Sequence, residues 1–204
     1  MRMRKKKNLD SRLSAVSDYF IKDLSELEKI KAAHLEIGCG KGKFITETAL
    51  LHPDILFIAA ERVSSVILLA AEKAAAKNIK NIRFYCGDII NFSEIENSHF
   101  CDRIYLNFSD PWPRGRHAKR RLTANGFLNL YKKLLKPGAE IHMKTDNTEL
   151  FNFSLETFEE NGFSLSDVTR DLHSEPESGN IMTEYETNFS SRGIPICRLV
   201  AKIK

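Results

Sequence analysis

The sequence lacks any apolar run approaching the roughly 18 to 20 residues that a membrane-spanning helix needs. Behind the basic N-terminus there is no apolar stretch of the kind found in secretory signals. Cysteine is also scarce, with four residues at positions 39, 86, 101 and 197. This spacing fits neither a CxxC zinc or redox motif nor the disulfide framework of a secreted protein. We therefore expect a cytoplasmic protein with reduced cysteines, no metal and no membrane partner.

An excess of charge of one sign is absent as well. The 204 residues include 31 Lys and Arg against 27 Asp and Glu, a net charge of +4 that falls short of diagnosing nucleic-acid binding. A chain of this length buries about 70% of its unfolded surface and needs no disulfide or metal to form a core. We expect a basic, mobile segment at residues 1–10 and a single domain at residues 11–204, and the distribution of charge must indicate the partners.

Strand and helix patterns alternate along the chain. Apolar residues recur every three or four positions over residues 9–27, which predicts an amphipathic helix. Short apolar runs predict strands at 34–37, 55–60, 82–86, 101–108, 139–145, 165–171 and 196–202. Helical patterns occupy 44–51, 64–77, 123–135, 148–161 and 184–191, and Lys136-Pro137-Gly138 is expected to stop the third of these. The alternation predicts an α/β fold with a parallel, doubly wound sheet, whose ligands bind at the carboxyl ends of the strands.

The first predicted strand ends in a glycine-rich turn that carries a carboxylate. Glu36 is followed by Gly38, Gly40 and Gly42 in a GxGxG spacing, one residue shorter than the GxGxxG of dinucleotide enzymes. Glu36 would repel a pyrophosphate but attract the ammonium and sulfonium groups of S-adenosylmethionine. The alternative is a turn in which the glycines serve packing only.

Two more acids follow the next strands. Glu61 ends the second strand, where a carboxylate commonly accepts both ribose hydroxyls of an adenosine ligand, a feature shared with NAD enzymes. Asp88 follows the third strand and could accept a hydrogen bond from an adenine amino group. Each acid alone could be a solvated turn residue, but three at successive strand ends favour a cofactor site.

The fourth strand ends in Asp110-Pro-Trp112-Pro, in which the prolines restrict the backbone on both sides of Trp112. A rigidly presented acid and aromatic side chain are therefore expected beside the cofactor. The residues that follow are mostly basic and predict phosphate contacts with a nucleic acid, the alternative being a solvated loop: Arg114, Arg116, His117, Lys119, Arg120 and Arg121.

Two later motifs allow a local and a functional interpretation. Thr183-Glu184-Tyr185-Glu186 has the pattern of a helix capping box, yet it follows an irregular stretch long enough to be a functional loop. Asp146, at the end of the fifth strand, could be an ordinary helix N-cap or a site residue.

Together these motifs resemble those of the bacterial tRNA (guanine-N7)-methyltransferases, a class I S-adenosylmethionine-dependent family of Rossmann-like proteins. The resemblance implies a seven-stranded, mostly parallel sheet with the last strand antiparallel, and methyl transfer to N7 of a guanine in the variable loop of tRNA. It implies Glu36, Glu61, Asp88 and Asp110 around the cofactor, with Asp110 catalytic. It assigns Arg114, which replaces a family lysine, with Asp146 and Thr183, Glu184, Tyr185 and Glu186 to the substrate.

The predicted chemistry fits these residue types. Guanine N7 carries an in-plane lone pair, so transfer needs alignment rather than proton removal, and a carboxylate such as Asp110 can stabilise the positive charge that develops. Two alternatives stay open: methylation of an exocyclic base amine, and a basic RNA-binding protein without catalysis. No obligate protein partner is implied.

Overall fold

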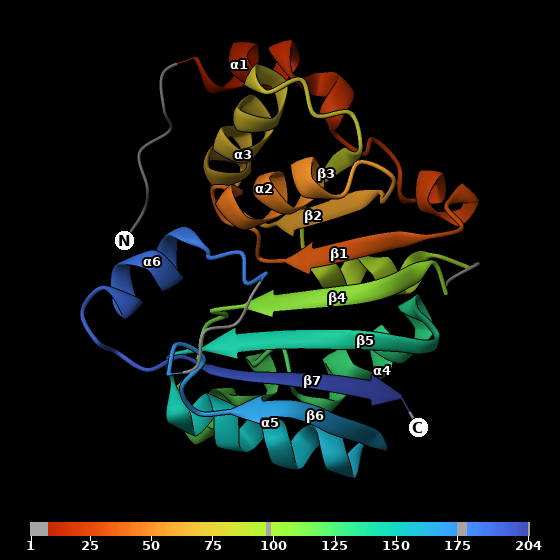
Figure 1. Ribbon diagram of the computed structural model, residues 1–204. Helices are drawn as coiled ribbons and strands as arrows, with labels where there is room; N and C mark the ends of the chain where they lie inside the picture. Colours follow the sequence, from red (N-terminus) through yellow and green to blue (C-terminus); the bar gives the residue numbers. More distant parts are fainter. Residues whose placement is uncertain (1–7, 97–98, 175–178, 204) are drawn as a thin grey trace.

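The computed structural model describes residues 8–96, 99–174 and 179–203 (Figure 1). Its seven strands are β1 Ala33–Ile37, β2 Phe57–Glu61, β3 Ile82–Cys86, β4 Cys101–Asn107, β5 Leu135–Thr145, β6 Phe163–Thr169 and β7 Cys197–Ile203. They form one sheet in the order β3-β2-β1-β4-β5-β7-β6. The strands from β1 to β5 are parallel, and β7 is antiparallel to both β5 and β6. The predicted architecture, with an antiparallel last strand, is confirmed.

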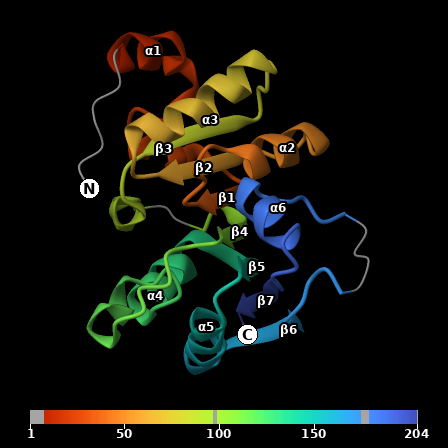
Figure 2. The same ribbon diagram turned by 90° about the vertical axis from the view of Figure 1, so that its left-hand side faces the viewer.

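The helices cover the two faces of the sheet unequally. They are α1 Leu9–Ala15, α2 Lys43–Leu51, α3 Ser64–Ala76, α4 Asn125–Leu134, α5 Thr148–Glu160 and α6 Glu184–Ser190. Short 3-10 segments lie at η1 Ser17–Tyr19, η2 Leu24–Lys29, η3 Ile89–Glu94 and η4 Gly115–Arg120. Helices α2 and α3 cover one face over β1 to β3, whereas α4 and α5 cover the opposite face, and α6 lies beyond the carboxyl ends of β1 and β4 (Figures 1 and 2). Among the described residues, no helix is long and apolar enough to cross a membrane.

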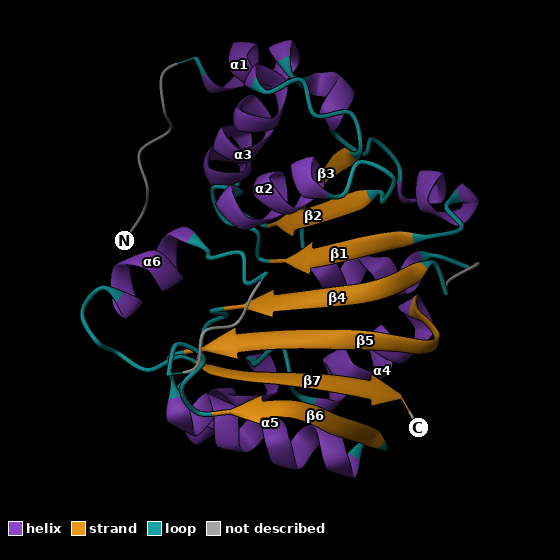
Figure 3. Cartoon of the chain, in the orientation of Figure 1, coloured by secondary structure: helices purple, strands orange, loops and turns teal. Residues whose placement is uncertain are grey.

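The single helix predicted for residues 9–27 is wrong. Helix α1 ends at Ala15, and two 3-10 segments follow it (Figure 3). Between them the chain is extended, and the backbone N–H of Ile21 donates to the carbonyl of Phe84 on β3 at 2.9 Å. A capping box formed by Asp23 and Glu26 then starts η2. The periodic apolar residues mark the buried side of this segment correctly, but strand pairing and capping decide its backbone.

The helix stop predicted at residues 136–138 is confirmed, but the strand expected from residue 139 begins earlier, so β5 runs through these residues. Helix α4 ends at Leu134, and β5 begins at once with Leu135. The pairing of β5 with β4 skips the residues between Leu135 and Glu140, and Gly138 has a φ of +80°. Glycine takes this left-handed conformation without steric cost, so the irregularity is absorbed inside the strand.

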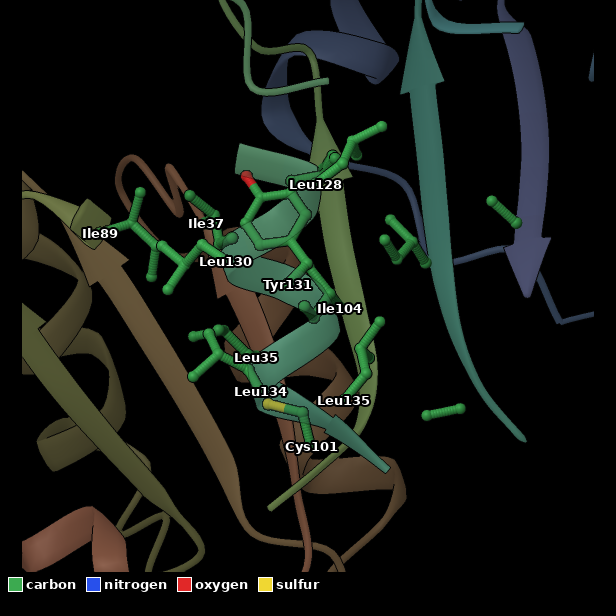
Figure 4. Packing of buried hydrophobic residues seen from close by; sticks show 14 of the residues in the cluster. Leu35, Ile37, Ile89, Cys101, Ile104, Leu128, Leu130, Tyr131, Leu134 and Leu135 are labelled. Carbon is green, nitrogen blue, oxygen red and sulfur yellow. The ribbon is translucent and has the colours of Figure 1, made fainter. Parts of the chain in front are cut away.

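The main core lies between the sheet and helices α4 and α5. Leu35 and Ile37 of β1 point toward Tyr131 and Leu134 of α4, and all four side chains are buried (Figure 4). The Tyr131 hydroxyl lies within this apolar cluster, and burial raises its pKa well above the ordinary value. A second cluster joins residues of β2 and β3 to helices α1, α2 and α3. The sheet is thereby fixed on both faces on the side where the site forms.

The other half of the sheet has one solvated face. Buried and partly exposed residues alternate from Ala139 to Met143 of β5, and polar side chains such as Arg103 of β4 and Glu140 and His142 of β5 lie opposite the α4 side. Among the described elements, no helix covers this half of the face (Figures 1 and 2). At the outer edge, the pairing of β6 with β7 shifts between Ser166 and Thr169. Asp167, inside this irregularity, has a φ of +49°.

Candidate functional site

Two adjoining cavities lie where the parallel strands end. The larger one, of about 730 Å³, is lined by Gly38, Glu61, Asp88, Asp110, Trp112, Lys119 and Arg120 among others. The smaller one, of about 320 Å³, is lined by Glu36, Gly38, Gly40, Gly42, Thr183, Glu184 and Tyr185 among others. Gly38, Asn107 and Phe108 line both, so the cavities meet between the ends of β1 and β4. The structure thus brings most of the predicted site residues together.

The glycine turn opens toward both cavities. Gly38 and Gly40 have φ values of +78° and +56°, and a Cβ atom at either position would meet no atom within 4 Å. Gly42 has another role, because a Cβ atom there would lie 2.5 Å from the Cβ of Ala70. Gly42 therefore allows α2 to pack closely on α3, while the first two glycines expose backbone to a ligand.

Glu36 carries a buried carboxylate with one unpaired oxygen. The side chain is 2% exposed, and its Oε1 accepts a hydrogen bond from Nδ2 of Asn107 at 3.0 Å. Its Oε2 has no hydrogen-bond partner among the described residues. Burial raises the pKa of Glu36 to about 7, although Asn107 and Lys144 act in the opposite direction. A ligand cation in the smaller cavity would supply the missing partner.

The carboxylates of Glu61 and Asp88 accept hydrogen bonds from backbone N–H groups at neighbouring strand ends. The Glu61 oxygens accept from the N–H groups of Gly40 at 3.3 Å and Val63 at 3.0 Å. Asp88 accepts from Ile90 N at 3.1 Å as the N-cap of η3. Both carboxylates also line the larger cavity, and each oxygen has a second lone pair for a ligand donor.

The loop that carries Asp110 is fixed by hydrogen bonds from Arg121. Phe108 and Trp112 both have positive φ values, of 53° and 43°, which cost about 1 to 3 kcal/mol each for residues other than glycine. Arg121 donates from Nε to the carbonyl of Pro111 at 2.9 Å and from Nη2 to that of Trp112 at 3.3 Å. Asp110 itself is exposed and lines the larger cavity.

Arg121 therefore differs from the prediction that grouped it with the phosphate-binding residues. It is 8% exposed, and its guanidinium lies 4.5 Å from the ring centroid of Phe153. A buried arginine that donates to two loop carbonyls fixes the loop and is inaccessible to a phosphate. The sequence offered no signal for this, because the basic residues of positions 114–121 look alike until the turn is formed.

The remaining basic residues lie on η4 or, in the case of Arg114, directly before it as the N-cap residue, where an irregular loop was expected. Arg114, Arg116, Lys119 and Arg120 are exposed or partly exposed. The Arg120 guanidinium lies 4.9 Å from the Trp112 ring centroid, and His117 packs against the edge of the same ring at 5.8 Å. Lys119 and Arg120 line the larger cavity beside Trp112, and we call the segment 114–120, which carries all four cations, the rim of this cavity.

The capping box predicted at Thr183 forms. Glu186 N donates to Oγ1 of Thr183 at 2.9 Å, and Thr183 N donates back to Oε2 of Glu186 at 3.4 Å. Glu186 is 0% exposed, so it acts through its neighbours instead of at the cavity wall where substrate contact was predicted. Glu184 lines the smaller cavity and pairs with Lys73 at 3.2 Å and Lys41 at 3.6 Å.

Asp146 does not take the capping role that the sequence allowed. Asn147 caps α5 instead, accepting from Leu150 N at 2.8 Å. Tyr185 lies beside Asp146, and burial together with this carboxylate raises the pKa of the Tyr185 hydroxyl. The Tyr185 ring stacks on Phe189 with centroids 4.1 Å apart. Asp146 and Tyr185 thus form one polar corner beside α6.

Comparison with known proteins identifies the family. A family model described as a putative methyltransferase matches residues 31–199. A tRNA (guanine-N(7)-)-methyltransferase of Macrococcus caseolyticus (strain JCSC5402) is 43% identical over 209 residues, covering 99% of this chain and 100% of the relative. One of the same name from Brevibacillus brevis (strain 47 / JCM 6285 / NBRC 100599) is 51% identical over 169 residues, covering 82% and 79%. The chain belongs to the tRNA (guanine-N7)-methyltransferase family.

Solved structures agree with this family in fold. The 16S rRNA methyltransferase KamB superposes with a TM-score of 0.62 at 17% identity, covering 100% of this chain and 96% of that one. Precorrin-6y C5,15-methyltransferase from Geobacter metallireducens GS-15 gives 0.59 at 13% identity, covering 98% and 94%. At such identities the likeness shows the fold alone, and it confirms the predicted Rossmann-like fold.

The site includes two residues that sequence reasoning missed. Asn107, the last residue of β4, holds Glu36, and Lys144 near the end of β5 contacts the segment before α6. Both stand at strand ends, and that position was the signal that could have found them. Among the residues that the structure describes, no group of three or more His, Cys, Asp or Glu side chains could hold a metal ion.

The burial of Glu36 predicts a specific dependence of stability on pH. Its pKa of about 7 in the folded protein exceeds the ordinary 4.5, so the neutral carboxyl favours folding and stability falls as the pH rises from about 4.5 to 7. The loss from this group is about 3 kcal/mol, at 1.36 kcal/mol for each pH unit between the two values. Urea unfolding of the ligand-free protein at pH 5 and pH 8 measures it. Glu36→Gln should lack this component, and an identical pH dependence in both proteins would contradict the assignment.

Arg121 gives a second prediction, on the loop. Arg121→Met removes two charge-assisted hydrogen bonds to Pro111 and Trp112 carbonyls and should lower the free energy of unfolding by about 2 kcal/mol or more. Arg116→Met, at an exposed position, should change it by less than about 0.5 kcal/mol. Denaturant unfolding of both variants provides the comparison. Equal stabilities would show that Arg121 does not support the loop.

Proposed function

We propose that this chain transfers a methyl group from S-adenosylmethionine to N7 of a guanine in the variable loop of tRNA. The observation that carries the proposal is the unpaired, buried oxygen of Glu36 beside the glycine turn, in a chain whose relatives of that name match it over nearly its full length. This oxygen lacks a hydrogen-bond partner, and the ammonium group of a ligand would supply one together with a compensating charge. A tRNA partner and a cytoplasmic location belong to the same proposal.

The residues present fit S-adenosylmethionine. Glu36 would accept from its ammonium group, Glu61 from the ribose hydroxyls and Asp88 from the adenine amino group, each carboxylate lining one of the two cavities. When bound, this cofactor supplies an electrophilic methyl group on a sulfonium. The open φ-positive turn at Gly38 and Gly40 allows a ligand to approach the backbone, which a side chain at either position would obstruct.

Asp110 and the loop around it would act on the guanine. N7 presents its lone pair without losing a proton, so the chain needs no general base and the alignment of the base carries the catalysis. The exposed Asp110 carboxylate can accept from guanine N–H donors and stabilise the positive charge that develops on the ring. Arg121 holds the backbone that carries it, and Trp112 forms a wall of the same cavity.

Methylation of an exocyclic base amine is the nearest alternative. A tRNA transcript with 7-deazaguanine at the target position keeps the exocyclic amine and lacks the N7 acceptor. Labelled methyl transfer should be lost with this transcript, and nucleoside analysis of an ordinary transcript should give 7-methylguanosine. Transfer to the 7-deaza transcript would refute the proposal in favour of the amine.

Asp110→Ala should lose methyl transfer by about a hundredfold or more, because a charge that stabilises the transition state is removed. The melting temperature should stay close to that of the wild type, since the Asp110 side chain is exposed. Initial rates on a tRNA transcript measure the loss. Asp54→Ala, an exposed acid in the turn before β2, is the matched control. A rate near that of the wild type would remove Asp110 from the reaction centre.

The exposed cations of the rim should bind tRNA phosphates. A triple variant, Arg114→Met, Arg116→Met and Lys119→Met, should bind tRNA more weakly and with a flatter salt dependence, by up to about 0.9 in log–log slope for each duplex phosphate that is no longer neutralised. Filter binding at several salt concentrations measures the slope. The control replaces three exposed lysines elsewhere on the chain, Lys29, Lys77 and Lys80, by Met and should keep the slope. Equal slopes would place the rim cations in solvent.

A further inference from the structure

Lys144 is a buried cation at the end of β5. Its side chain is 11% exposed, and its Nζ donates to Oδ1 of Asn180 at 2.5 Å and to the carbonyl of Ile181 at 3.1 Å. It also donates to Oε2 of Glu186 at 3.1 Å, and it lies 5.6 Å from the ring centroid of Phe44. One lysine thus joins a sheet strand to a segment 36 to 42 residues further along the chain.

Glu186 connects Lys144 to the wall of the smaller cavity. Its Oε2 binds Lys144 and the Thr183 N–H, while its Oε1 accepts from Nδ2 of Asn180 at 2.8 Å and lies 3.2 Å from Nε2 of His173. Residues 183–185 directly line the smaller cavity. Their position therefore depends on a buried carboxylate whose nearest lysine is Lys144.

Lys144 also acts on Glu36, which lines the same cavity. Lys144 is paired with Asn107 across β5 and β4, and Asn107 donates to Glu36 at 3.0 Å. The charge of Lys144 favours the ionised form of Glu36 and partly offsets the effect of burial on the Glu36 pKa, whereas Glu61 acts in the reverse sense. The other charged or titratable groups that couple to Glu36 or line the same cavity are Cys39, Lys41, Lys43, Tyr105, Glu184 and Tyr185. Lys144 is the buried lysine that serves both Glu36 and Glu186.

A buried ion pair contributes little net stability, but removing one partner leaves an uncompensated charge and is costly. A pair of this kind is therefore suited to specifying an arrangement. We infer that Lys144 is a positioning residue, which holds residues 181–185 against the smaller cavity through Glu186 and stabilises the Glu36 carboxylate in the wall of the same cavity. The inference rests on the proposed function for the identity of the ligand, and it assigns Lys144 no contact with the reacting atoms.

Two substitutions separate this role from simple loosening of the fold. Lys144→Met removes the cation, so Glu36 should ionise at a pH higher by about 1 than in the wild type. Glu186→Gln keeps the Thr183 capping acceptor and leaves the Lys144 charge without its counterion, so Glu36 should ionise at a lower pH than in the wild type. If the substitutions only loosened the fold, Glu36 would ionise at a lower pH in both variants, closer to the ordinary pKa of a carboxyl group.

The direct measurement is a carbon-13 NMR titration of the Glu36 carboxyl in the ligand-free protein, assigned by its disappearance in Glu36→Gln. Lys80→Met, at an exposed lysine, should leave the midpoint unchanged. Should Lys144→Met fail to fold, the double variant Lys144→Met with Glu186→Gln carries no unpaired buried charge from this pair. It is expected to fold but to lose methyl transfer by about tenfold or more, equivalent to about 1.4 kcal/mol.

Calorimetry with S-adenosylhomocysteine, which retains the ammonium group, gives the second measurement. In Lys144→Met the affinity at pH 7 should be several-fold weaker and should approach that of the wild type at pH 9. Equal Glu36 midpoints in the wild type and Lys144→Met, a shift of both single variants in one direction, or full methyl transfer in the double variant would overturn the inference. A wild-type protein that neither binds S-adenosylhomocysteine nor methylates tRNA would instead refute the proposed function, and the NMR midpoints would still test Lys144.

Discussion

Six of the seven strands run in one direction, so the carboxyl ends of β1 to β6 lie at a single edge of the molecule. A parallel sheet brings residues together there regardless of their separation along the chain. Glu36 and Asn107 are 71 positions apart and hydrogen-bonded, because β1 and β4 are neighbours in the sheet. The two cavities, the glycine turn and the Asp110 loop all depend on this shared direction, and the α2, α3 and α4 packing keeps the edge in place.

Charge is distributed around this edge according to depth. The exposed cations Lys119 and Arg120 line the larger cavity, carboxylates that also bind backbone N–H groups form part of its wall, and a few ionisable groups near the two cavities are buried. Water cannot screen the inner charges well, so each acts strongly on its neighbours. Glu36, Lys144 and Glu186 form a line of alternating sign from the end of β1 to α6. Such a line fixes the geometry of two walls more effectively than it stabilises the fold.

Sequence patterns predicted what depends on local rules. The glycine turn, the strand-end acids and the Thr183 capping box could all be identified, because each rests on spacing within a few residues. What failed depended on distant partners. In the sequence Arg121 could not be distinguished from its basic neighbours, because its role depends on the Pro111 carbonyl to which it donates. The segment after α1 has a helical pattern of apolar residues, but its backbone pairs with β3 instead. The sequence allowed Glu186 to be either a capping residue or a substrate contact. Its burial beside Lys144, a residue 42 positions away, is visible only in the folded structure.

The irregular end of β6 has a consequence for how copies of this protein meet. A sheet edge with free N–H and C=O groups is a template for pairing with another chain, and long flat edges promote aggregation. Here the pairing shift between Ser166 and Thr169, with the left-handed Asp167 inside it, breaks the outer edge after a few residues. At the opposite edge, Ile21 takes up a backbone acceptor of β3. Both borders of the sheet thus offer only short templates, which disfavours edge-to-edge polymerisation when the protein is concentrated.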